Sequence, residues 1–254
     1  MNSSDIQALK NTSIRQVKNL GPHLMTTDNY PLLYQPITKC GSTFLRNILW
    51  YLDNGEPLPP GFDRENQPWA EGWKPADIQK NRYKFTVVRH PVQRFMSLYF
   101  DKILGKTDGV PIRLSRTFLR NADIDQDAGE DLEMHRRNCG NALEFIANQF
   151  ATKPFSKINW HWKPQMVRMS HLRDFGFSTL HLEGLDWQLP QVIGGLVPNI
   201  DKALQAVKTA NKSVKPVKAE DILTKELRLK IREIYKTDYL IWKEVRNFWQ
   251  DKQG

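Results

Sequence analysis

Short apolar runs alternate along the chain with stripes of apolar residues at helical spacing. Residues 30–37 (YPLLYQPI) form an apolar run of strand length, and residues 44–52 carry apolar side chains at helical spacing. Between them lies the small, polar stretch 38–42 (TKCGS). We expect Ser42 to cap the helix and Gly55 to end it. The pattern therefore predicts a strand, a tight turn and a helix.

The same order recurs further along the chain. Residues 83–89 (YKFTVVR) are rich in β-branched and aromatic side chains and predict a second strand. Pro91 can open a helix, and helically spaced apolar residues continue to Ile103. Residues 176–185 (GFSTLHLEGL) predict a third strand. Alternating strands and helices indicate an α/β fold with a parallel β-sheet flanked by helices.

Two segments lack a regular pattern. Residues 53–82 contain five prolines and three glycines, and residues 105–141 hold an acidic run. Both predict long loops, which inside a domain are usually functional or disordered. We expect helices over residues 141–150 and from Glu220 to near Trp249.

The length of 254 residues suits one domain, 1–254, in which residues 1–29 form a polar lead. The formal net charge of +9 favours an anionic partner: nucleic acid, a membrane surface, an acidic glycan or a polyphosphorylated cofactor. No window alternates basic and aromatic residues as nucleic-acid motifs do, so we expect no nucleic-acid partner.

The two cysteines, Cys40 and Cys139, do not make a disulfide framework, and no Cys/His cluster has zinc spacing. We therefore expect a reducing compartment and no metal. Residues 1–21 lack the apolar core of a signal peptide, and no apolar stretch has the length of a membrane span. These features predict a cytoplasmic protein without a membrane span.

The predicted turn at residues 39–43 (KCGST) has the composition of an anion site. Main-chain N–H groups at a helix N-terminus favour an anion, and Gly41 would let the chain approach a phosphate closely. Ser42 and Thr43 add hydroxyl donors, and Lys39 adds a full charge. The lysine precedes the glycine, unlike in the Walker motif. The alternative is an ordinary strand–helix connection capped by Ser42.

A second anion site is predicted where the second strand ends. Arg89 can contact a phosphate with two N–H groups, and Ser97, two helical turns further on, can add a hydroxyl. The alternative is an arginine paired with a nearby carboxylate.

Together the two segments resemble the sulfotransferases that use 3′-phosphoadenosine 5′-phosphosulfate (PAPS), which have a P-loop-like fold. The residues that match the family's 5′-phosphosulfate loop are Lys39, Gly41, Ser42, Thr43 and Phe44, although the family's proline is displaced to Pro36. Those that match its 3′-phosphate element are Arg89, Pro91, Arg94, Ser97 and Tyr99.

Four further segments extend the resemblance over about residues 30–242. Residues 161–165 (HWKPQ) resemble a segment of the carbohydrate sulfotransferases that act on chondroitin, dermatan and the HNK-1 glycan. Residues 182–185 (LEGL), 211–213 (NKS) and 235–239 (YKTDY) resemble the family's Glu-x-Leu strand, its late Asn-containing loop and its C-terminal helix. The animal members carry a membrane anchor and paired lumenal cysteines, and this sequence shows neither feature. We therefore expect a soluble, bacterial member.

The resemblance implies transfer of a sulfuryl group from PAPS to a hydroxyl of an acceptor, with a carbohydrate acceptor and no metal. The implied cofactor-binding residues are Lys39, Cys40, Gly41, Ser42, Thr43, Phe44, Arg89, Ser97 and Lys212. Lys39 would stabilise the leaving phosphate.

A base must take the proton of the acceptor hydroxyl, and histidine suits this near neutral pH. His161 is the candidate, with His135 next in line, and the alternative is that His161 is a core residue. We expect His135 and Trp162 to bind the acceptor and His90 to shape its turn. The predicted loops 53–82 and 105–141 would line the acceptor cleft.

Two other functions stay open at this point. A nucleotide kinase of related architecture would need a Walker lysine and a metal-binding carboxylate, which are not placed correctly in this sequence. A non-catalytic basic protein that binds nucleic acid or an anionic polymer would explain the charge but not the paired motifs.

Overall fold

The computed structural model describes residues 24–59, 76, 78, 81–107, 109–170, 172–208 and 216–253. The chain divides into two compact units. The sheet unit comprises residues 1–88, 165–212 and 243–254, and the helical unit comprises residues 89–164 and 213–242. A single domain over residues 1–254 stays a prediction.

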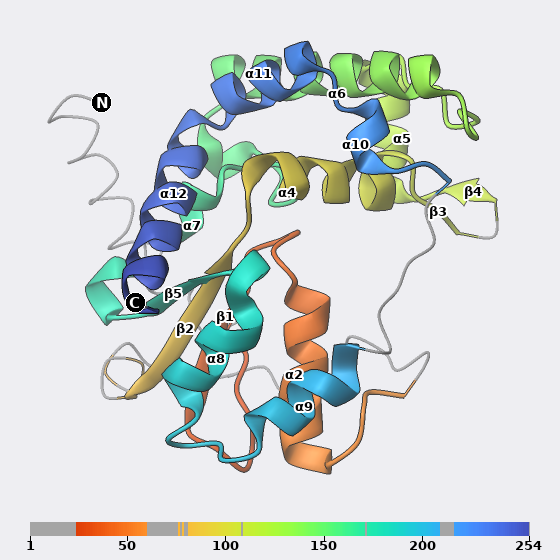
Figure 1. The fold of residues 1–254 in the computed structure, drawn as a ribbon. Helices are drawn as coiled ribbons and strands as arrows, with labels where there is room; N and C mark the ends of the chain where they lie inside the picture. Colours follow the sequence, from red (N-terminus) through yellow and green to blue (C-terminus); the bar gives the residue numbers. More distant parts are fainter. Residues whose placement is uncertain are drawn as a thin grey trace, which may run out of the picture. The chain divides into compact units, whose positions relative to one another are not determined.

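The sheet unit is built on three parallel strands: β1 (Leu32–Gln35), β2 (Tyr83–Val88) and β5 (Ser178–His181). Their order is β1-β2-β5, with the buried strand β2 in the centre (Figure 1). This arrangement confirms the predicted α/β fold with a parallel sheet flanked by helices. β1 is shorter than predicted because Pro36, which lacks an N–H donor, follows it directly.

Helix α2 (Ser42–Asn54) follows β1 and turns Leu45, Ile48 and Leu49 toward the core. Gly55 ends it in the left-handed conformation at φ 74°, as predicted. The predicted cap, however, is wrong: Gly41 is the N-cap residue, and Ser42 is already helical.

Three helices of the sheet unit were not predicted: α7 (Gln165–Met169), α8 (Leu185–Ile193) and α9 (Ile200–Lys208). Helix α9 packs against α2, and α8 packs against β2 and β5 (Figure 1). The predicted third strand ends early because Leu182–Gly184 forms a 3-10 turn, η6, before α8.

Helix α12 (Lys236–Asp251) contributes its last part, from residue 243 onward, to the sheet unit. There the indole Nε1 of Trp249 donates a hydrogen bond to the carbonyl oxygen of Thr179 on β5, at 2.7 Å. On the same strand, the main-chain N–H of His181 donates to Oε1 of Gln188 at 2.9 Å. The side chains of Trp249 and Gln188 thus bond to main-chain groups of the edge strand β5. Those groups could otherwise pair with a strand of another molecule.

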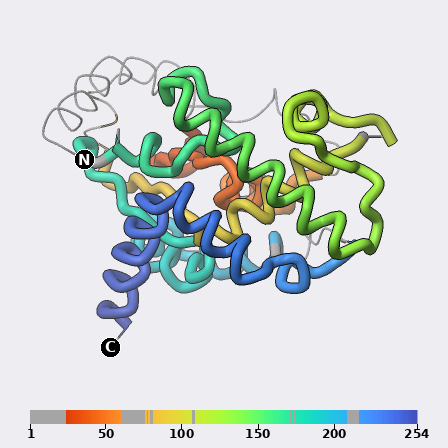
Figure 2. Tube along the Cα trace, turned by 90° about the horizontal axis from the view of Figure 1, so that it is seen from above, coloured from red at the N-terminus to blue at the C-terminus, as the bar shows by residue number. Residues whose placement is uncertain are grey.

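The helical unit contains helices and one short hairpin of two strands. Helices α6 and α11 run side by side in Figure 2 and pack against each other. The elements are α4 (Pro91–Leu98), the π-helix η3 (Tyr99–Ile103), β3 (Lys106–Thr107), β4 (Val110–Pro111), α5 (Arg113–Asn121), α6 (Leu132–Thr152), η4 (Phe155–Lys157), α10 (Ala219–Ile222), α11 (Lys225–Ile234) and the first part of α12.

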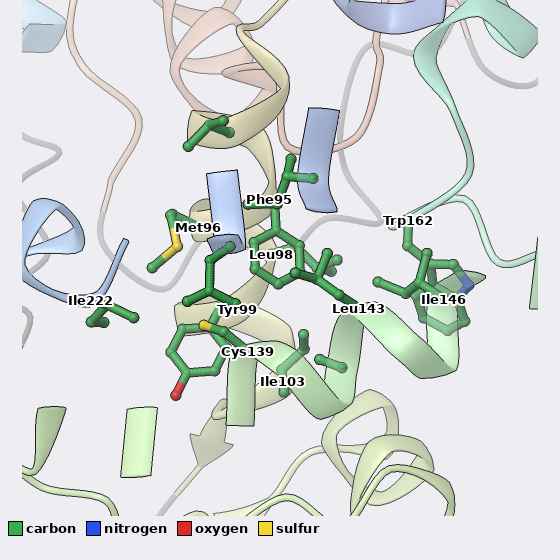
Figure 3. Close-up of a cluster of buried hydrophobic side chains, with 14 of the residues drawn as sticks. Phe95, Met96, Leu98, Tyr99, Ile103, Cys139, Leu143, Ile146, Trp162 and Ile222 are labelled. Atoms are coloured by element: carbon green, nitrogen blue, oxygen red, sulfur yellow. The ribbon is translucent and has the colours of Figure 1, made fainter. Parts of the chain in front are cut away.

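A hydrophobic core fills the helical unit (Figure 3). Phe95 and Tyr99 reach it from α4 and η3, Leu143 and Ile146 from α6, and Trp162 from the segment before α7. Two distant stretches of the sequence are thereby joined in one core.

The prediction of a loop over residues 105–141 is wrong. This segment contains the hairpin, α5 and the first part of α6, which begins at Leu132 instead of residue 141. Asp131 caps α6, since its side chain accepts a hydrogen bond from the Met134 N–H at 3.0 Å. The buried stripe of this helix includes His135 and Asn138, so the hydrophobic pattern hid it.

The helix predicted from Glu220 is divided, because the Thr224 side chain accepts the Leu227 N–H and starts a new helix, α11. Within the part of the chain that the structure describes, no helix combines the length and the apolar character needed to cross a membrane.

Candidate functional site

The turn between β1 and α2 has an uncommon backbone. The N–H of Cys40 donates to the carbonyl oxygen of Ile37 at 3.1 Å, which closes a turn. Lys39 lies in this turn at φ 67° and Gly41 follows at φ 79°. A left-handed lysine is strained by about 1–2 kcal/mol, and such residues cluster at functional sites.

Helix α2 opens onto this turn. Its first N–H groups, at Ser42, Thr43 and Phe44, have no carbonyl four residues earlier in the helix, and no side chain caps them. Alternating left-handed residues before a helix N-terminus form a concave anion site. Gly41 is required there for two reasons: its φ, and a Cβ atom that would lie 2.6 Å from Cδ1 of Leu182.

The side chain of Cys40 faces away from solvent. It is fully buried, and its Sγ donates to Oε1 of Gln165, the first residue of α7, at 3.0 Å. Cys40 can therefore contact an anion only through its main chain. The contact also joins the turn to the end of the HWKPQ segment, a link that the sequence did not indicate.

The turn lies at the edge of the sheet where α/β proteins bind ligands. Strands β1 and β2 are parallel, with Gln35 in register with Thr86, so their carboxyl ends share one edge. Thr86 Oγ1 donates to the Gln35 carbonyl oxygen at 2.9 Å and fixes the two strand ends together.

The second predicted anion site begins directly after β2. Arg89 is half-buried, and Pro91 is the first residue of α4, as predicted. Ser97 lies in the second turn of α4 and is partly accessible. His90 precedes the helix, and its ring packs edge-on against Trp242 with 4.5 Å between centroids. Its role in shaping the turn stays a prediction.

Arg94, the second arginine of this motif, is a structural residue. It is 3% exposed, and its Nη2 donates to the carbonyl oxygens of Lys163 at 2.8 Å and His161 at 3.4 Å. Its Nη1 lies 3.9 Å from the carboxylate of Asp238, which is buried as well. Arg94 thus binds together three segments quoted for the resemblance: residues 89–99, 161–165 and 235–239.

His161 is held by Asn159. Oδ1 of Asn159 lies 3.0 Å from the main-chain nitrogen and 2.9 Å from Nδ1 of His161. The main-chain N–H can only donate, so the atom that it meets must be the amide oxygen, whichever way the side-chain amide was assigned. Nδ1 must then donate as well. The neutral ring therefore carries its proton on Nδ1 and its lone pair on Nε2, the form that a base requires.

His135 has the environment of a structural histidine, and we assign it no acceptor contact. It is 1% exposed, and both ring nitrogens are engaged: Nδ1 with the Tyr99 hydroxyl at 2.7 Å and Nε2 with the Gly129 carbonyl oxygen at 3.0 Å. The carbonyl can only accept, so Nε2 is the protonated nitrogen and Nδ1 accepts from Tyr99. Burial leaves it no surface for a ligand.

Trp162 is also a core residue. It is 4% exposed and packs edge-on against Phe118 with 5.2 Å between centroids. Its neighbour Trp160 is 36% exposed, and the Lys163 ammonium lies 3.6 Å from the centre of its ring. Of the two tryptophans beside His161, Trp160 is therefore the exposed one.

Two predictions concern other parts of the site. Lys212 lies outside the described residues, as do residues 60–75 of the predicted loop 53–82. Among the residues that the structure describes, no group of three His, Cys, Asp or Glu side chains is placed to hold a metal ion.

Comparison with known proteins gives a family for the chain. Neither the curated proteins nor the solved structures contain a significant match. A family model, described as the sulfotransferase family, matches residues 22–243, which include both anion-site segments and the HWKPQ segment. The chain belongs to the sulfotransferase family.

Proposed function

We propose that this sulfotransferase uses PAPS as its donor and a carbohydrate hydroxyl as its acceptor, with His161 as the base. The observation that carries the proposal is the turn at residues 37–44, where a left-handed lysine and a left-handed glycine precede the open N-terminus of α2. This combination suits a dense negative charge better than a neutral ligand.

PAPS, when bound, supplies the sulfuryl group and leaves as adenosine 3′,5′-bisphosphate. The main-chain N–H groups of residues 41–44 would hold the 5′-phosphate. Lys39 would neutralise charge that develops on the leaving oxygen, which is the main task in a transfer of this kind. Gly41 fits this role, because a left-handed residue without a side chain lets the main chain of the turn approach a phosphate closely.

Arg89 and Ser97 would hold the 3′-phosphate. Arginine binds a phosphate through two parallel N–H groups, and Ser97 adds one hydroxyl from the following helix. Lys212, in the segment that resembles the family's late loop, would contribute a further charge.

His161 would accept the proton of the acceptor hydroxyl on Nε2. The support for this role is the tautomer that Asn159 imposes, together with the two carbonyl contacts by which Arg94 holds residues 161 and 163. No step requires a metal ion.

A carbohydrate acceptor is supported by Trp160. Its ring is 36% exposed, lies next to His161 in the sequence, and could cover the apolar face of a sugar. The composition and the resemblance favour a cytoplasmic, bacterial enzyme. The acceptor cleft would include part of residues 53–82 and 105–141.

Calorimetric titration with adenosine 3′,5′-bisphosphate, in buffer with EDTA, tests the donor. We expect micromolar binding to the wild type and a loss of about 100-fold in Arg89→Ala, as for a charged hydrogen-bonded pair worth about 3 kcal/mol. Gln93→Ala, in helix α4 shortly after Arg89, is the control and should bind normally. A folded wild type that does not bind the nucleotide would remove PAPS as the donor.

A further inference from the structure

A depression lies at the amino ends of two strands of the sheet unit. Its volume is about 750 Å³, and its lining includes Tyr83, the first residue of β2, and Ser178, the first residue of β5. The turn at residues 37–44 follows the carboxyl end of β1, which is parallel to β2. The six residues of β2 span about 20 Å, so the depression and the turn are separate sites at opposite ends of the sheet.

Aromatic rings and cations line this depression. Phe248 is a large apolar side chain that is 53% exposed, so its ring is accessible to a ligand in the depression. Two cations, Arg82 and Lys252, face one acid, Glu244, in the lining. Within the described part of the chain, neither cation forms an ion pair. The other aromatic residues of the lining are Tyr83, Phe177 and Trp249.

The aromatic part of the depression is held in place before any ligand arrives. Trp249 is fixed by its hydrogen bond to Thr179 at 2.7 Å and by edge-on packing against Trp187, at 5.7 Å between centroids. The Lys252 ammonium lies 4.5 Å from the centre of the Phe248 ring and 5.2 Å from that of Trp249. A positive charge thus lies directly beside two ring faces.

We propose that this depression binds a saccharide that carries a sulfate ester or a carboxylate. Ring faces cover the C–H faces of a sugar, one of the strand hydroxyls at Ser178 and Thr179 together with the amide of Gln191 can bond to its hydroxyls, and Lys252 and Arg82 pair with its anion. The inference rests on the proposed carbohydrate acceptor. Each transfer adds a sulfate ester, so a chain that already carries one has the charge that the depression selects.

The test is a titration of the full chain with a chondroitin sulfate hexasaccharide and with its desulfated counterpart, at constant ionic strength. Lys252→Ala and Phe248→Ala should each weaken binding roughly tenfold, because the first removes the ion pair with the anion of the ligand and the second removes a ring that covers a sugar face. Both residues are exposed, so neither change should affect folding. Lys243→Ala is the matched control, since it removes one exposed charge from α12, the helix that Lys252 directly follows, at a position outside the lining.

The sulfated probe identifies a sulfate ester as the ligand if it binds more tightly than the desulfated one, and equal binding identifies the carboxylate. Equal weakening by Lys243→Ala, or unchanged binding in both lining variants, would overturn the proposal. The same samples are titrated with adenosine 3′,5′-bisphosphate. A wild type that binds this nucleotide but no hexasaccharide removes only the second site, whereas one that binds the hexasaccharide through Lys252 but no nucleotide removes only the proposed donor.

Discussion

One oxygen of Asn159 accepts two hydrogen bonds from His161, from the main-chain N–H at 3.0 Å and from Nδ1 at 2.9 Å. The pair sets both the orientation and the tautomer of the imidazole. Because the residues are only two apart, a local feature of the chain prepares the ring for proton transfer before any ligand binds.

Substitution of the proposed base, His161, should lower turnover more than substitution of its hydrogen-bond partner, Asn159. His161→Ala should lower kcat by about 100-fold or more, the usual contribution of a general base. Asn159→Ala should lower kcat roughly tenfold, since the ring is kept but its tautomer is no longer fixed. Steady-state kinetics and nucleotide titration separate the two effects. Unchanged turnover in His161→Ala would place the base elsewhere, and a loss of nucleotide affinity would indicate a structural effect instead.

Two substitutions of Lys39 should have the same effect on activity but different effects on stability. Lys39→Ala and Lys39→Gly should both abolish transfer. At φ 67°, however, glycine relieves the strain of the left-handed conformation, so Lys39→Gly should be more stable than Lys39→Ala by about 1 kcal/mol. Urea unfolding and a transfer assay measure the two properties. Near-normal turnover in either variant would contradict the role proposed for the lysine.

Gly41 and Gly55 form a matched pair at the two ends of α2. Both are left-handed, at φ 79° and 74°, so alanine at either position should cost about 1 kcal/mol. A Cβ at Gly55 meets nothing within 4 Å, whereas at Gly41 it meets Leu182. Gly41→Ala should therefore be the less stable variant and should lose nucleotide binding, while Gly55→Ala should keep it. Equal binding by the two variants would show that the turn does not hold the nucleotide.

Arg94 should matter for stability more than any exposed arginine. Arg94→Met should destabilise the protein by about 3–5 kcal/mol, because it removes a buried cation that lies 3.9 Å from the buried Asp238 carboxylate and donates to two carbonyl oxygens. Arg116→Met, on the exposed face of α5, should change the free energy of unfolding by less than about 0.5 kcal/mol. The double variant with Asp238→Leu should recover part of the loss. Failure of the double variant to do so would mean that the carbonyl contacts, and not the ion pair, carry the effect.

Buried hydroxyl groups should make the protein sensitive to alkali. Burial raises the pKa of Tyr34 and of Tyr99, so the folded state keeps these protons while the unfolded chain releases them. Stability should therefore be complete below the unfolded pKa of about 10 and fall as pH rises above it. Denaturant titrations from pH 8 to pH 11 measure this slope.

The two tyrosines differ in their hydrogen bonds. Among the described residues the Tyr34 hydroxyl has no partner, so Tyr34→Phe should flatten the alkaline slope at little cost. Tyr99→Phe should cost about 1–3 kcal/mol at neutral pH, because it removes the partner of His135 Nδ1. Equal costs for the two changes would contradict these environments.

The sequence predicted best where chemistry and periodicity coincide. The strands at residues 32–35 and 83–88, the stop at Gly55 and the opening of α4 at Pro91 follow from apolar runs beside glycine and proline. Helix α6 was predicted only in part, because His135, Asn138 and Cys139 fill core positions that a hydrophobic pattern does not recognise.

Long-range contacts explain the remaining differences at the site. Nothing near Arg94 in the sequence indicates that its partners are Lys163 and Asp238, and nothing near Cys40 indicates Gln165. The burial of Trp162 depends likewise on its packing against Phe118 and Phe145, which lie 44 and 17 residues earlier in the sequence. The sequence did contain a signal for Asn159, because this polar residue lies two positions before the candidate base, but its contact with His161 was not predicted.

The hydrogen bond from Trp249 to Thr179 has a practical consequence for handling the protein. A chain cut before residue 249 would leave the carbonyl of Thr179 unpaired on an edge strand, where a strand of another molecule could add to it. Shortened forms should therefore self-associate, and an affinity tag is better fused at the amino end than next to this helix.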